Sequence, residues 1–458
     1  MVNLKDIKMK PKLIGLFLIV GLIPLALVGF MASNLATSAL MEKSYNQLES
    51  VREIKKAQIE KYFAERKGDM GVLVETVDTL RQEAFSKLEA IQSIKKAQLM
   101  DYIGILTTGI HSQKDIPYTW TVIEEFKRAG KPGTASWNSL ARKYDPYYKE
   151  MIEENGWYDY FLISPEGRIV YTVTRESDLG MSIPNSELRD SGIGQAFKEA
   201  QRMGEEDVAI GDIAPYSPSN GAPAGFMMGR IVADGKFHGY NALQIPIEKI
   251  NNIMLRRDGM GKTGETYLVG QDGLMRSDSY LDPKGHSVEA SMRNREGVDT
   301  EATRSALAGN AGQDVIIDYN GNPVLSAWHP VELGNGVRWA MISEIDVAEA
   351  FSPVDENGNE YYKKYADMYG YYDLFLINPD GYIFYTVARE ADYQTNIVNG
   401  KFSSSNLGKL VREVLQSKRY GMADFEPYEP SNGEPAAFIA QPVLHEGGVE
   451  AIVALQPP

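Results

Sequence analysis

The chain opens with an uninterrupted apolar stretch. Residues 13–41 contain no charged side chain, and residues 13–32 are strongly apolar, which is long enough to cross the roughly 30 Å hydrocarbon core of a bilayer as a helix. Four lysines and one aspartate precede this stretch, so the positive-inside rule places residues 1–12 in the cytoplasm. We therefore predict a cytoplasmic tail over 1–12 and a transmembrane helix over 13–33. The alternative is a cleaved signal peptide, whose apolar region is usually shorter; either interpretation leaves the rest of the chain extracytoplasmic.

An amphipathic pattern follows. Residues 34–112 lack proline, and apolar side chains such as Phe85, Leu88 and Ile91 recur at spacings of three and four, which is typical of a helix with one apolar face. The pentapeptide IKKAQ occurs twice, forty residues apart, so both copies face the same side of a continuous helix. We predict a helical stalk over 34–112, while Gly68 and Gly71 leave a break or hairpin open. One interpretation is a solvated stalk with a packing seam. We favour the other, in which the apolar face of the stalk is the contact surface of a homodimer, because such a face must be buried somewhere.

Farther along, short apolar runs and alternating positions occur in two nearly identical stretches. Residues 158–176 are YDYFLISPEGRIVYTVTRE, and residues 372–390 are YDLFLINPDGYIFYTVARE. Each predicts a β-hairpin, because proline presets one turn position and glycine tolerates positive φ at another. A second matched pair follows, with DIAPYSPSNGAPA at 212–224 and DFEPYEPSNGEPA at 424–436. Two ungapped matches in the same order indicate a duplicated domain.

The remaining pattern predicts an α+β protein with antiparallel sheets. A helical run to Glu154, the first hairpin, a helix over 187–203 and strands over 224–232 and 240–245 predict a first domain, 113–250. A second, shorter domain, 251–352, is predicted from the following elements: a linker helix over 248–258, strand–turn–strand over 264–279, a helix over 301–308, and closing strands over 314–319, 323–328 and 338–345. A polar junction then leads into a third module, 353–458, which repeats the first domain.

Composition narrows the classes of function. The formal net charge of −15 argues against a nucleic-acid partner, because binding to phosphates needs a basic surface. The chain has no cysteine and five histidines, so neither thiol chemistry nor a His-rich metal cluster is expected. Gly259, Gly261 and Gly264 match a dinucleotide-binding spacing, but they precede a predicted strand instead of following one, so we expect no nucleotide site there. No cofactor and no catalytic residues are predicted.

The order of these elements, with the motifs themselves, resembles the double Cache sensor region of bacterial methyl-accepting chemotaxis receptors. FLISPEGRIVYTV with PYSPSNGAPA is similar to a membrane-distal Cache domain, and GETYLVGQDGLMRSDS with WAMISEIDVAEAF is similar to a membrane-proximal one. The resemblance covers residues 13–458. It implies a transmembrane helix, a helical stalk and tandem PAS-like antiparallel sheets flanked by helices, with a ligand pocket on one face of a sheet.

The chain departs from that family at two points. The AEAF segment of the family normally leads to a second membrane helix and a cytoplasmic signalling domain, but Phe351 here leads into the third module. We expect a fragment, an unusual fusion, or a chain without output of its own. The amino-acid-binding signature of double Cache domains is also incomplete, because no arginine stands two residues before Trp157.

Candidate ligand-binding residues are aromatic and charged side chains in the matched motifs, because a pocket for a polar metabolite needs aromatic walls and a few charged anchors. Arginine offers a fork for a carboxylate, and aspartate accepts from an ammonium. The candidates in the first domain are Tyr171, Arg175, Asp178, Asp212 and Tyr216, with Phe226 and Met228 as the apolar wall. Those in the third module are Tyr385, Arg389, Asp392, Asp424 and Tyr428, and those in the second domain are Tyr267, Arg276, Asp278 and Trp328. The alternative is that the tyrosines are half-buried sheet residues and the charges are surface pairs.

These observations favour a sensor of small molecules. The resemblance implies a transmembrane, chemoreceptor-like signalling protein of the bacterial inner membrane, with most of the chain periplasmic. Its ligand would be an amino acid, an organic acid or an amine, and its signal would pass through the stalk helix. The alternative is a structural or adhesive surface protein built of Cache modules that binds no ligand.

Overall fold

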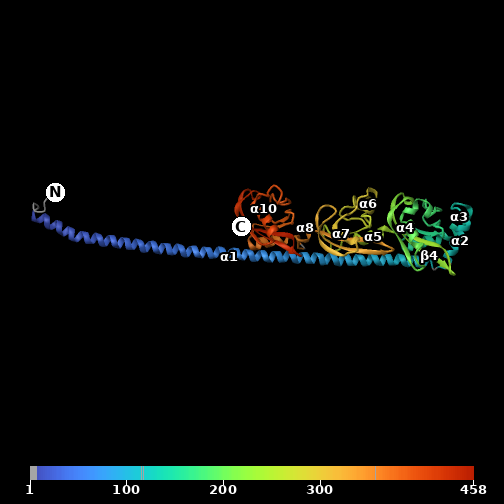
Figure 1. Ribbon diagram of the computed structural model, residues 1–458, viewed down its shortest axis with the longest axis horizontal. Coiled ribbons are helices and arrows are strands. Elements are labelled where there is room, and N and C mark those ends of the chain that lie inside the picture. The colour runs from blue at the N-terminus through green and yellow to red at the C-terminus, as the bar shows by residue number, and fades with distance from the viewer. Residues whose placement is uncertain (1–7, 115, 117, 356) are drawn as a thin grey trace. The chain divides into compact units, whose positions relative to one another are not determined.

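The computed structural model describes residues 8–114, 116, 118–355 and 357–458. The chain divides into two compact units, residues 1–73 and 74–458. Helix α1 (Met9–Lys114) contributes to both units and is labelled in Figure 1 together with helices of the three sheet-containing parts. Gly68 and Gly71 lie inside α1, so the break or hairpin that they left open is absent there.

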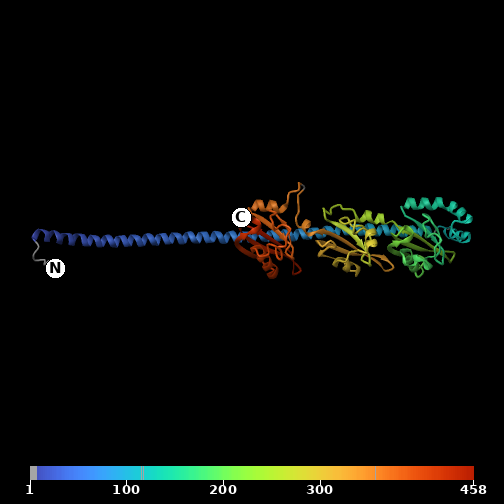
Figure 2. The same ribbon diagram turned by 90° about the horizontal axis from the view of Figure 1, so that it is seen from above.

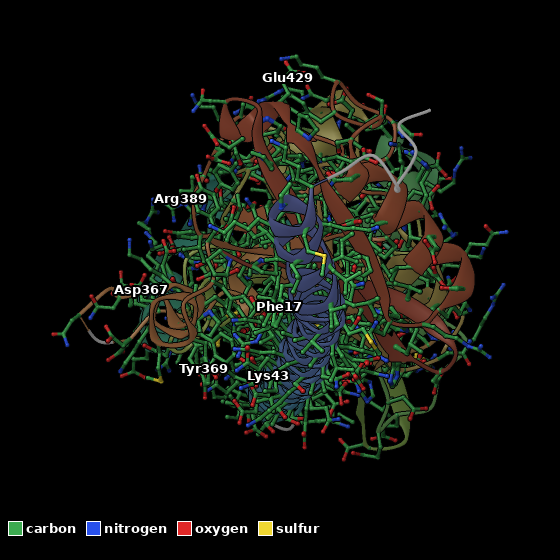
Figure 3. All side chains as sticks on the ribbon, turned by 90° about the vertical axis from the view of Figure 1, so that its left-hand side faces the viewer. Phe17, Lys43, Asp367, Tyr369, Arg389 and Glu429 are labelled. Carbon is green, nitrogen blue, oxygen red and sulfur yellow. The ribbon has the colours of Figure 1, made fainter. Side chains whose placement is uncertain are left out.

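The N-terminal unit consists of the first part of α1 in its described residues. Its apolar side chains between Leu13 and Met31 are exposed, and Phe17 projects from the helix in Figure 3. Among the described residues α1 alone is long and apolar enough to cross a membrane, a property that a signal sequence near an N-terminus shares. The following turns carry exposed charge pairs at helical spacing, such as Lys61 with Glu65, which stabilise a solvated helix weakly.

The first sheet has the strand order β2-β1-β5-β4-β3, and all neighbours are antiparallel. Its strands are β1 (Tyr160–Ile163), β2 (Ile169–Thr172), β3 (Val208–Tyr216), β4 (Ala222–Ala233) and β5 (Lys236–Ile245). Its helices are α2 (Thr119–Ala129), α3 (Ala135–Asn155) and α4 (Gly192–Ala200), with short 3₁₀ turns η1 (Ile183–Asn185), η2 (Glu187–Asp190) and η3 (Ser217–Ser219). In Figure 2 the teal helices lie beside the green strands of this sheet. The predicted hairpin is confirmed, and β3 is a strand that the sequence pattern did not reveal.

The second sheet has the order β6-β9-β8-β7. Its strands are β6 (Glu265–Val269), β7 (Gly312–Ile317), β8 (Pro323–Gly334) and β9 (Val337–Asp346), and its helices are α5 (Ile247–Met254), α6 (Val288–Asn294), α7 (Glu301–Leu307) and α8 (Val347–Ala350). The prediction of a second strand after the turn at 270–273 is wrong. That segment forms only one bridge, between Val269 and Met275.

The third sheet repeats the first, with the order β11-β10-β14-β13-β12. Its strands are β10 (Asp373–Ile377), β11 (Ile383–Thr386), β12 (Gly421–Tyr428), β13 (Glu434–His445) and β14 (Gly448–Gln456), and its helices are α9 (Tyr361–Tyr369), α10 (Asn406–Ser417) and the 3₁₀ turn η4 (Glu429–Ser431). The pairing Leu162 with Tyr171 corresponds to Leu376 with Tyr385, and both hairpins shift register one residue later. The duplication therefore extends to the irregularities of the sheets.

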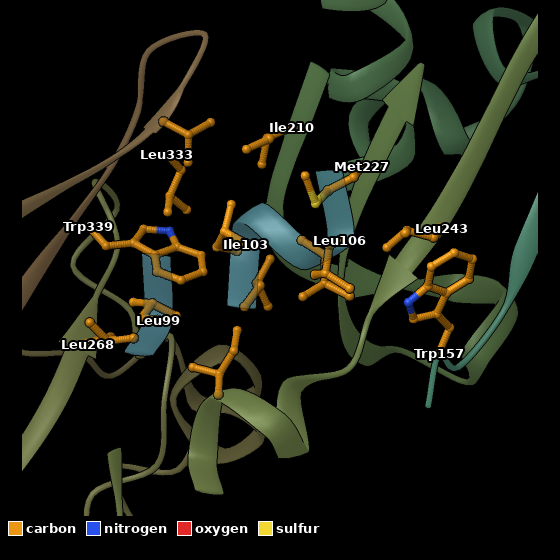
Figure 4. Close-up of a cluster of buried hydrophobic side chains, with 14 of the residues drawn as sticks. Leu99, Ile103, Leu106, Trp157, Ile210, Met227, Leu243, Leu268, Leu333 and Trp339 are labelled. Carbon is orange, nitrogen blue, oxygen red and sulfur yellow. The ribbon is translucent and has the colours of Figure 1, made fainter. Parts of the chain in front are cut away.

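Within residues 74–458, α1 contacts all three sheets. Arg81 forms a buried ion pair with Glu450 of β14. Gln92 donates to the carbonyl groups of β8 and β9, 2.8 Å from Ala327 O and 3.0 Å from Met341 O. Asn241 of β5 donates to the carbonyl group of Ile110 at 2.9 Å. The apolar stripe of this half of α1 is thus buried inside the chain, as Figure 4 shows for Leu99, Ile103 and Leu106, and needs no partner helix there.

Candidate functional site

The first sheet buries two separate clusters, one on each face. Helices α1, α2 and α3 cover one face, where Tyr160, Tyr171 and Met227 lie. Helix α4 and the turns η1 and η2 cover the other face, where Tyr216, Phe226 and Met228 lie. Because successive side chains of a strand point to opposite faces, Met227 and Met228 belong to different clusters. Tyr171 therefore lies on one face of the sheet, and the residues Tyr216, Phe226 and Met228 lie on the other. The first-domain residues predicted to line one pocket are not brought together.

The face beneath α2 and α3 carries a group of stacked rings, here called the aromatic site. Its members come from two helices, two strands and the segment before β1: Phe126, Trp137, Tyr148, Trp157, Tyr160 and Tyr171. Tyr148 stacks on Tyr160 with ring centroids 5.5 Å apart and lies 5.2 Å from Tyr171. All six side chains are buried. The aromatic site is rich in ring faces, which attract cations, and in hydroxyl groups, which donate hydrogen bonds.

Asp145 of α3 supplies a charged group at the edge of the aromatic site. It accepts a hydrogen bond from the Tyr171 hydroxyl at 3.0 Å and forms an ion pair with Arg175. The guanidinium of Arg175 also lies over the Trp137 ring, 5.3 Å from its centroid. Arg175 has a φ of 59°, a left-handed conformation that non-glycine residues adopt at a cost. The backbone strain is maintained by these side-chain contacts.

Two polar atoms inside the aromatic site lack a partner in the described part of the chain, the hydroxyl of Tyr148 and the indole nitrogen of Trp157. The Tyr160 hydroxyl lies beside the Asn241 side chain, whose buried amide oxygen has no other partner among the described residues. Burial raises the pKa of Tyr148 and of Tyr160 well above the ordinary value, and the hydrogen bond with Asn241 lowers that of Tyr160. Both hydroxyls therefore remain protonated donors at physiological pH. Buried donors without acceptors are rare, and each costs roughly 1–3 kcal/mol, so the site is suited to a guest that accepts hydrogen bonds.

A surface cavity of about 670 Å³ lies next to the aromatic site. It shares Phe126 with the site, and its lining residue Val170 accepts a hydrogen bond from the Trp137 indole at 3.0 Å. Its lining includes the basic residues Lys127, Lys131 and Arg168 and the acidic residue Glu166. The loop between α2 and α3 forms part of the wall. Phe126 therefore belongs both to the aromatic site and to the wall of a partly basic cavity.

The third sheet contains a reduced version of this arrangement. The Tyr385 hydroxyl donates to Glu360 at 2.8 Å, and Arg389 forms an ion pair with the same carboxylate. Tyr362 lies 5.5 Å from the Tyr385 ring, and its hydroxyl has no partner among the described residues. The position of Tyr160 is taken by Leu374, which removes one donor. Arg389 repeats the left-handed backbone of its counterpart, with a φ of 52°.

The other face of each duplicated sheet has a buried tyrosine–aspartate hydrogen bond. The Tyr216 hydroxyl donates to Asp178 at 2.6 Å, and Tyr428 donates to Asp392 in the same way. Burial raises the pKa of Asp178 to about 6. The rings of Phe226 and Tyr216 pack edge to face. These contacts fasten the segment after the hairpin to the sheet.

Asp212 and Arg276, predicted to lie in separate pockets, form one ion pair between the first and second sheets, with N–O distances of 2.7 and 2.9 Å. Asp424, the counterpart of Asp212, is exposed. In the second sheet Tyr267 donates to Glu344 at 2.9 Å. Asp278 accepts a hydrogen bond from Asn251, and Trp328 is buried in the apolar core. These four second-domain candidates do not converge on one cavity.

Sequence reasoning missed Asp145, Tyr148 and Tyr160. Tyr160 alternates with Leu162 along β1, so a strict period of two along the hairpin could have placed it with Tyr171. Tyr148 lies in a helical run without a motif. Asp145 precedes Tyr171 by 26 residues, and nothing in the pattern connects the two.

Comparison with known proteins places the fold in a family. The family model described as Cache domain matches residues 32–354. Structures with a similar fold include the ligand-binding domain of the Campylobacter jejuni chemoreceptor Tlp3 in complex with L-norvaline, at 12% identity and a TM-score of 0.42 over 61% of this chain and 96% of that one. Another is the ligand-binding domain of the Pseudomonas fluorescens chemoreceptor CtaA in complex with L-isoleucine, at 13% identity and a TM-score of 0.36 over 60% and 95%. No curated protein matches the sequence. With a family model that spans most of its length, this chain belongs to the Cache domain family.

Proposed function

We propose that the chain is an extracytoplasmic sensor whose aromatic site binds a small polar metabolite of the amino-acid, organic-acid or amine class. The observation that carries the proposal is the pair of buried, unpartnered donors beneath α2 and α3, the Tyr148 hydroxyl and the Trp157 indole N–H. A polar guest would satisfy both, and burying them without one is costly. The membership in the Cache domain family supports a sensor role.

Each part of the site suits one part of such a ligand. The two hydroxyls and the Trp157 N–H can donate to a carboxylate, which is the group that hydroxyl and amide donors bind well. Ring faces and the Asp145 carboxylate suit an ammonium group. The basic side chains in the lining of the neighbouring cavity would attract an anionic end. Because Asp145 is already paired with Arg175, a ligand ammonium would compete for it.

The aromatic site lies directly against α1, which gives a route for transmission. A side chain on Gly109 would overlap with the Trp157 indole, and Asn241 donates to Ile110 of the same helix. A ligand that holds Trp157 and Tyr160 in one arrangement would thereby bias the packing of α1. Only a ligand with different affinity for the two arrangements can shift the population between them.

The proposal includes a membrane anchor and a dimer. The apolar side chains of residues 13–31 are exposed in the chain and suit a bilayer. Leu48, Val51 and Ile54 continue as an exposed apolar stripe along the N-terminal unit, where a second α1 would bury it. The chain has no cysteine, so Ile54→Cys provides a single thiol. We expect disulfide-linked dimers of Ile54→Cys in oxidised membranes and none for the charged-face control Lys55→Cys; equal cross-linking of both would contradict the seam.

A thermal-shift screen of amino acids, organic acids and amines tests the binding site. At least one compound should raise the Tm of the wild-type chain by about 2–4 °C. Tyr148→Phe removes an unpartnered hydroxyl, so it should leave the Tm without ligand unchanged or higher and abolish most of the ligand-induced shift. The matched control is Tyr362→Phe, which removes the equivalent hydroxyl of the third sheet and should leave the shift intact. A screen without hits, or a shift that Tyr148→Phe does not reduce, would count against the proposal.

A further inference from the structure

The outer edge of the first sheet is covered by the second sheet. Strand β3 is an edge strand, and edge strands carry backbone groups that need a partner. The side chain of Asn335, at the turn between β8 and β9, supplies one. Ile210 donates its N–H to the Asn335 side-chain oxygen at 2.8 Å, and the Asn335 amide donates to the Ile210 carbonyl at 2.9 Å. The Asn335 side chain thus satisfies both the N–H and the carbonyl group of Ile210.

An ion pair fixes the same edge. Asp212 accepts two hydrogen bonds from the Arg276 guanidinium and one, at 2.8 Å, from the indole of Trp339. Arg276 is only 2% exposed, so the pair is shielded from solvent. The flanking side chains Ile210 and Ile213 are 4% and 1% exposed. Figure 4 shows Ile210, Leu333 and Trp339 in this region.

The third sheet has the same edge without a cover. Met422 and Ile210 hold the same register against their neighbouring strands, and Asp424 accepts from the next backbone N–H at 2.8 Å as Asp212 does. The corresponding apolar residues are nevertheless open to solvent, with Met422 52% and Phe425 54% exposed. In the described part of the chain Asp424 forms no ion pair. The three residues Met422, Asp424 and Phe425 are here called the β12 edge.

We propose that the β12 edge is a docking surface for a Cache sheet of the second type, one that presents an arginine, a tryptophan and a turn asparagine as the second sheet does. The chain itself demonstrates the complementarity, because the same strand motif binds those three side chains at β3. Large exposed apolar side chains around a carboxylate match a partner with a buried guanidinium. The inference is independent of any ligand in the aromatic site.

A second copy of this chain is a poorer occupant. Pairing β12 with another β12 would bring Asp424 and Glu426 of one strand near the same carboxylates of the other, and like charges across strands are destabilising. The arginine face of the second sheet in such a copy is already occupied by its own Asp212. A basic, aromatic partner therefore fits the charge of the β12 edge better than the edge itself does.

Thiol labelling in an extended chain tests the proposal. Because the chain has no cysteine, Met422→Cys gives one thiol at the β12 edge. A second copy of residues 247–352 is joined after Pro458. In the first part of the chain the same segment follows directly after β5, and β14 is the strand that corresponds to β5. We expect the thiol to react with a maleimide at least about tenfold more slowly in the extended chain than in the chain that ends at Pro458.

Two variants complete the experiment. The appended copy carrying Arg276→Glu should restore fast labelling, because its carboxylate would face Asp424. Ile210→Cys in the unextended chain serves as the reference for a covered edge and should react slowly. Unchanged labelling of Met422→Cys beside a protease-resistant appended copy would overturn the proposal. An appended copy that stays protease-sensitive would also overturn it, because docking on the β12 edge is expected to order that segment.

Discussion

At the scale of single residues, several carboxylates in the described part of the chain are buried and form no ion pair. Glu344 of β9 is the clearest example: it accepts hydrogen bonds from the hydroxyls of Tyr267 and Ser326, each at 2.9 Å. Burial, together with the nearby carboxylates of Asp318 and Glu265, raises the pKa of Glu344 to about 8, although the hydrogen bonds from Tyr267 and Ser326 lower it. The side chain is therefore largely neutral at pH 7 in the folded protein and ionised in the unfolded chain.

The sign of the pH dependence follows from this raised pKa. Between the ordinary glutamate value of 4.5 and about 8, the unfolded chain releases a proton that the folded protein keeps, so stability falls as pH rises, by at most about 1.4 kcal/mol per pH unit. Glu344→Gln does not titrate. We expect the variant to gain roughly 3 kcal/mol relative to wild type between pH 5 and pH 8, measured by urea denaturation at both pH values.

A control separates this effect from other groups. The pKa of Lys95 is lowered to about 8 because the residue is buried, so its contribution changes above pH 8 and with the opposite sign. Asp178 and Asp346, whose pKa is raised to about 6 by burial, affect wild type and variant alike. A difference between wild type and Glu344→Gln that stays constant from pH 5 to pH 8 would contradict the assignment.

At the scale of elements, α1 contains two glycines in contrasting surroundings. A Cβ on Gly104 would meet nothing within 4 Å, whereas a Cβ on Gly109 would overlap with the Trp157 ring. Glycine destabilises an open helical position by about 1 kcal/mol relative to alanine, so Gly104→Ala should stabilise the chain by about that amount. Gly109→Ala should destabilise it by about 1–3 kcal/mol through overpacking. Chemical denaturation of the two variants checks the pair, and a stabilising Gly109→Ala would contradict the packing of α1 on the aromatic site.

The duplicated edge strands provide a second matched pair. Asp212→Ala leaves the buried Arg276 with the carboxylate of Asp272, 3.0 Å away, and the carbonyl group of Leu274, and removing one partner of a buried ion pair is strongly destabilising. We expect a loss of about 3–5 kcal/mol for Asp212→Ala. Asp424→Ala, at the exposed counterpart, should change the free energy of unfolding by less than about 0.5 kcal/mol. Equal losses at both sites would mean that the ion pair does not hold the edge.

These two strands also show what the sequence could predict. The hairpins and the duplication follow from alternation and turn residues, which act within a few positions. Which face a strand residue occupies depends on register, and a one-residue shift moves every side chain to the other face. For that reason the sequence pattern groups Phe226 and Met228 with Tyr171. In the structure Phe226 and Met228 share one face of the sheet, and Tyr171 lies on the other. The partners of Asp212 and Tyr171 are 64 residues later and 26 residues earlier in the chain, and such pairings arise only when the elements pack.

At the scale of the whole molecule, residues 74–458 place three antiparallel sheets along one helix, and two of the sheets match in strand order and register. The first sheet keeps Tyr148, Tyr160 and Asp145 beneath α2 and α3, while the third replaces one tyrosine with leucine. Both duplicated sheets carry the strained arginine and its carboxylate partner. We therefore propose that the first sheet binds the ligand and that the third sheet, with Leu374 in place of Tyr160, does not.

Backbone hydrogen exchange on the whole chain tests this assignment most directly. It is measured with and without a compound that raises the Tm in the screen. The account predicts slower exchange with the compound in α2, α3 and the β1–β2 hairpin, residues 119–172, and no change at residues 360–386. Slowing confined to the second or third sheet, or none at residues 119–172, would contradict it.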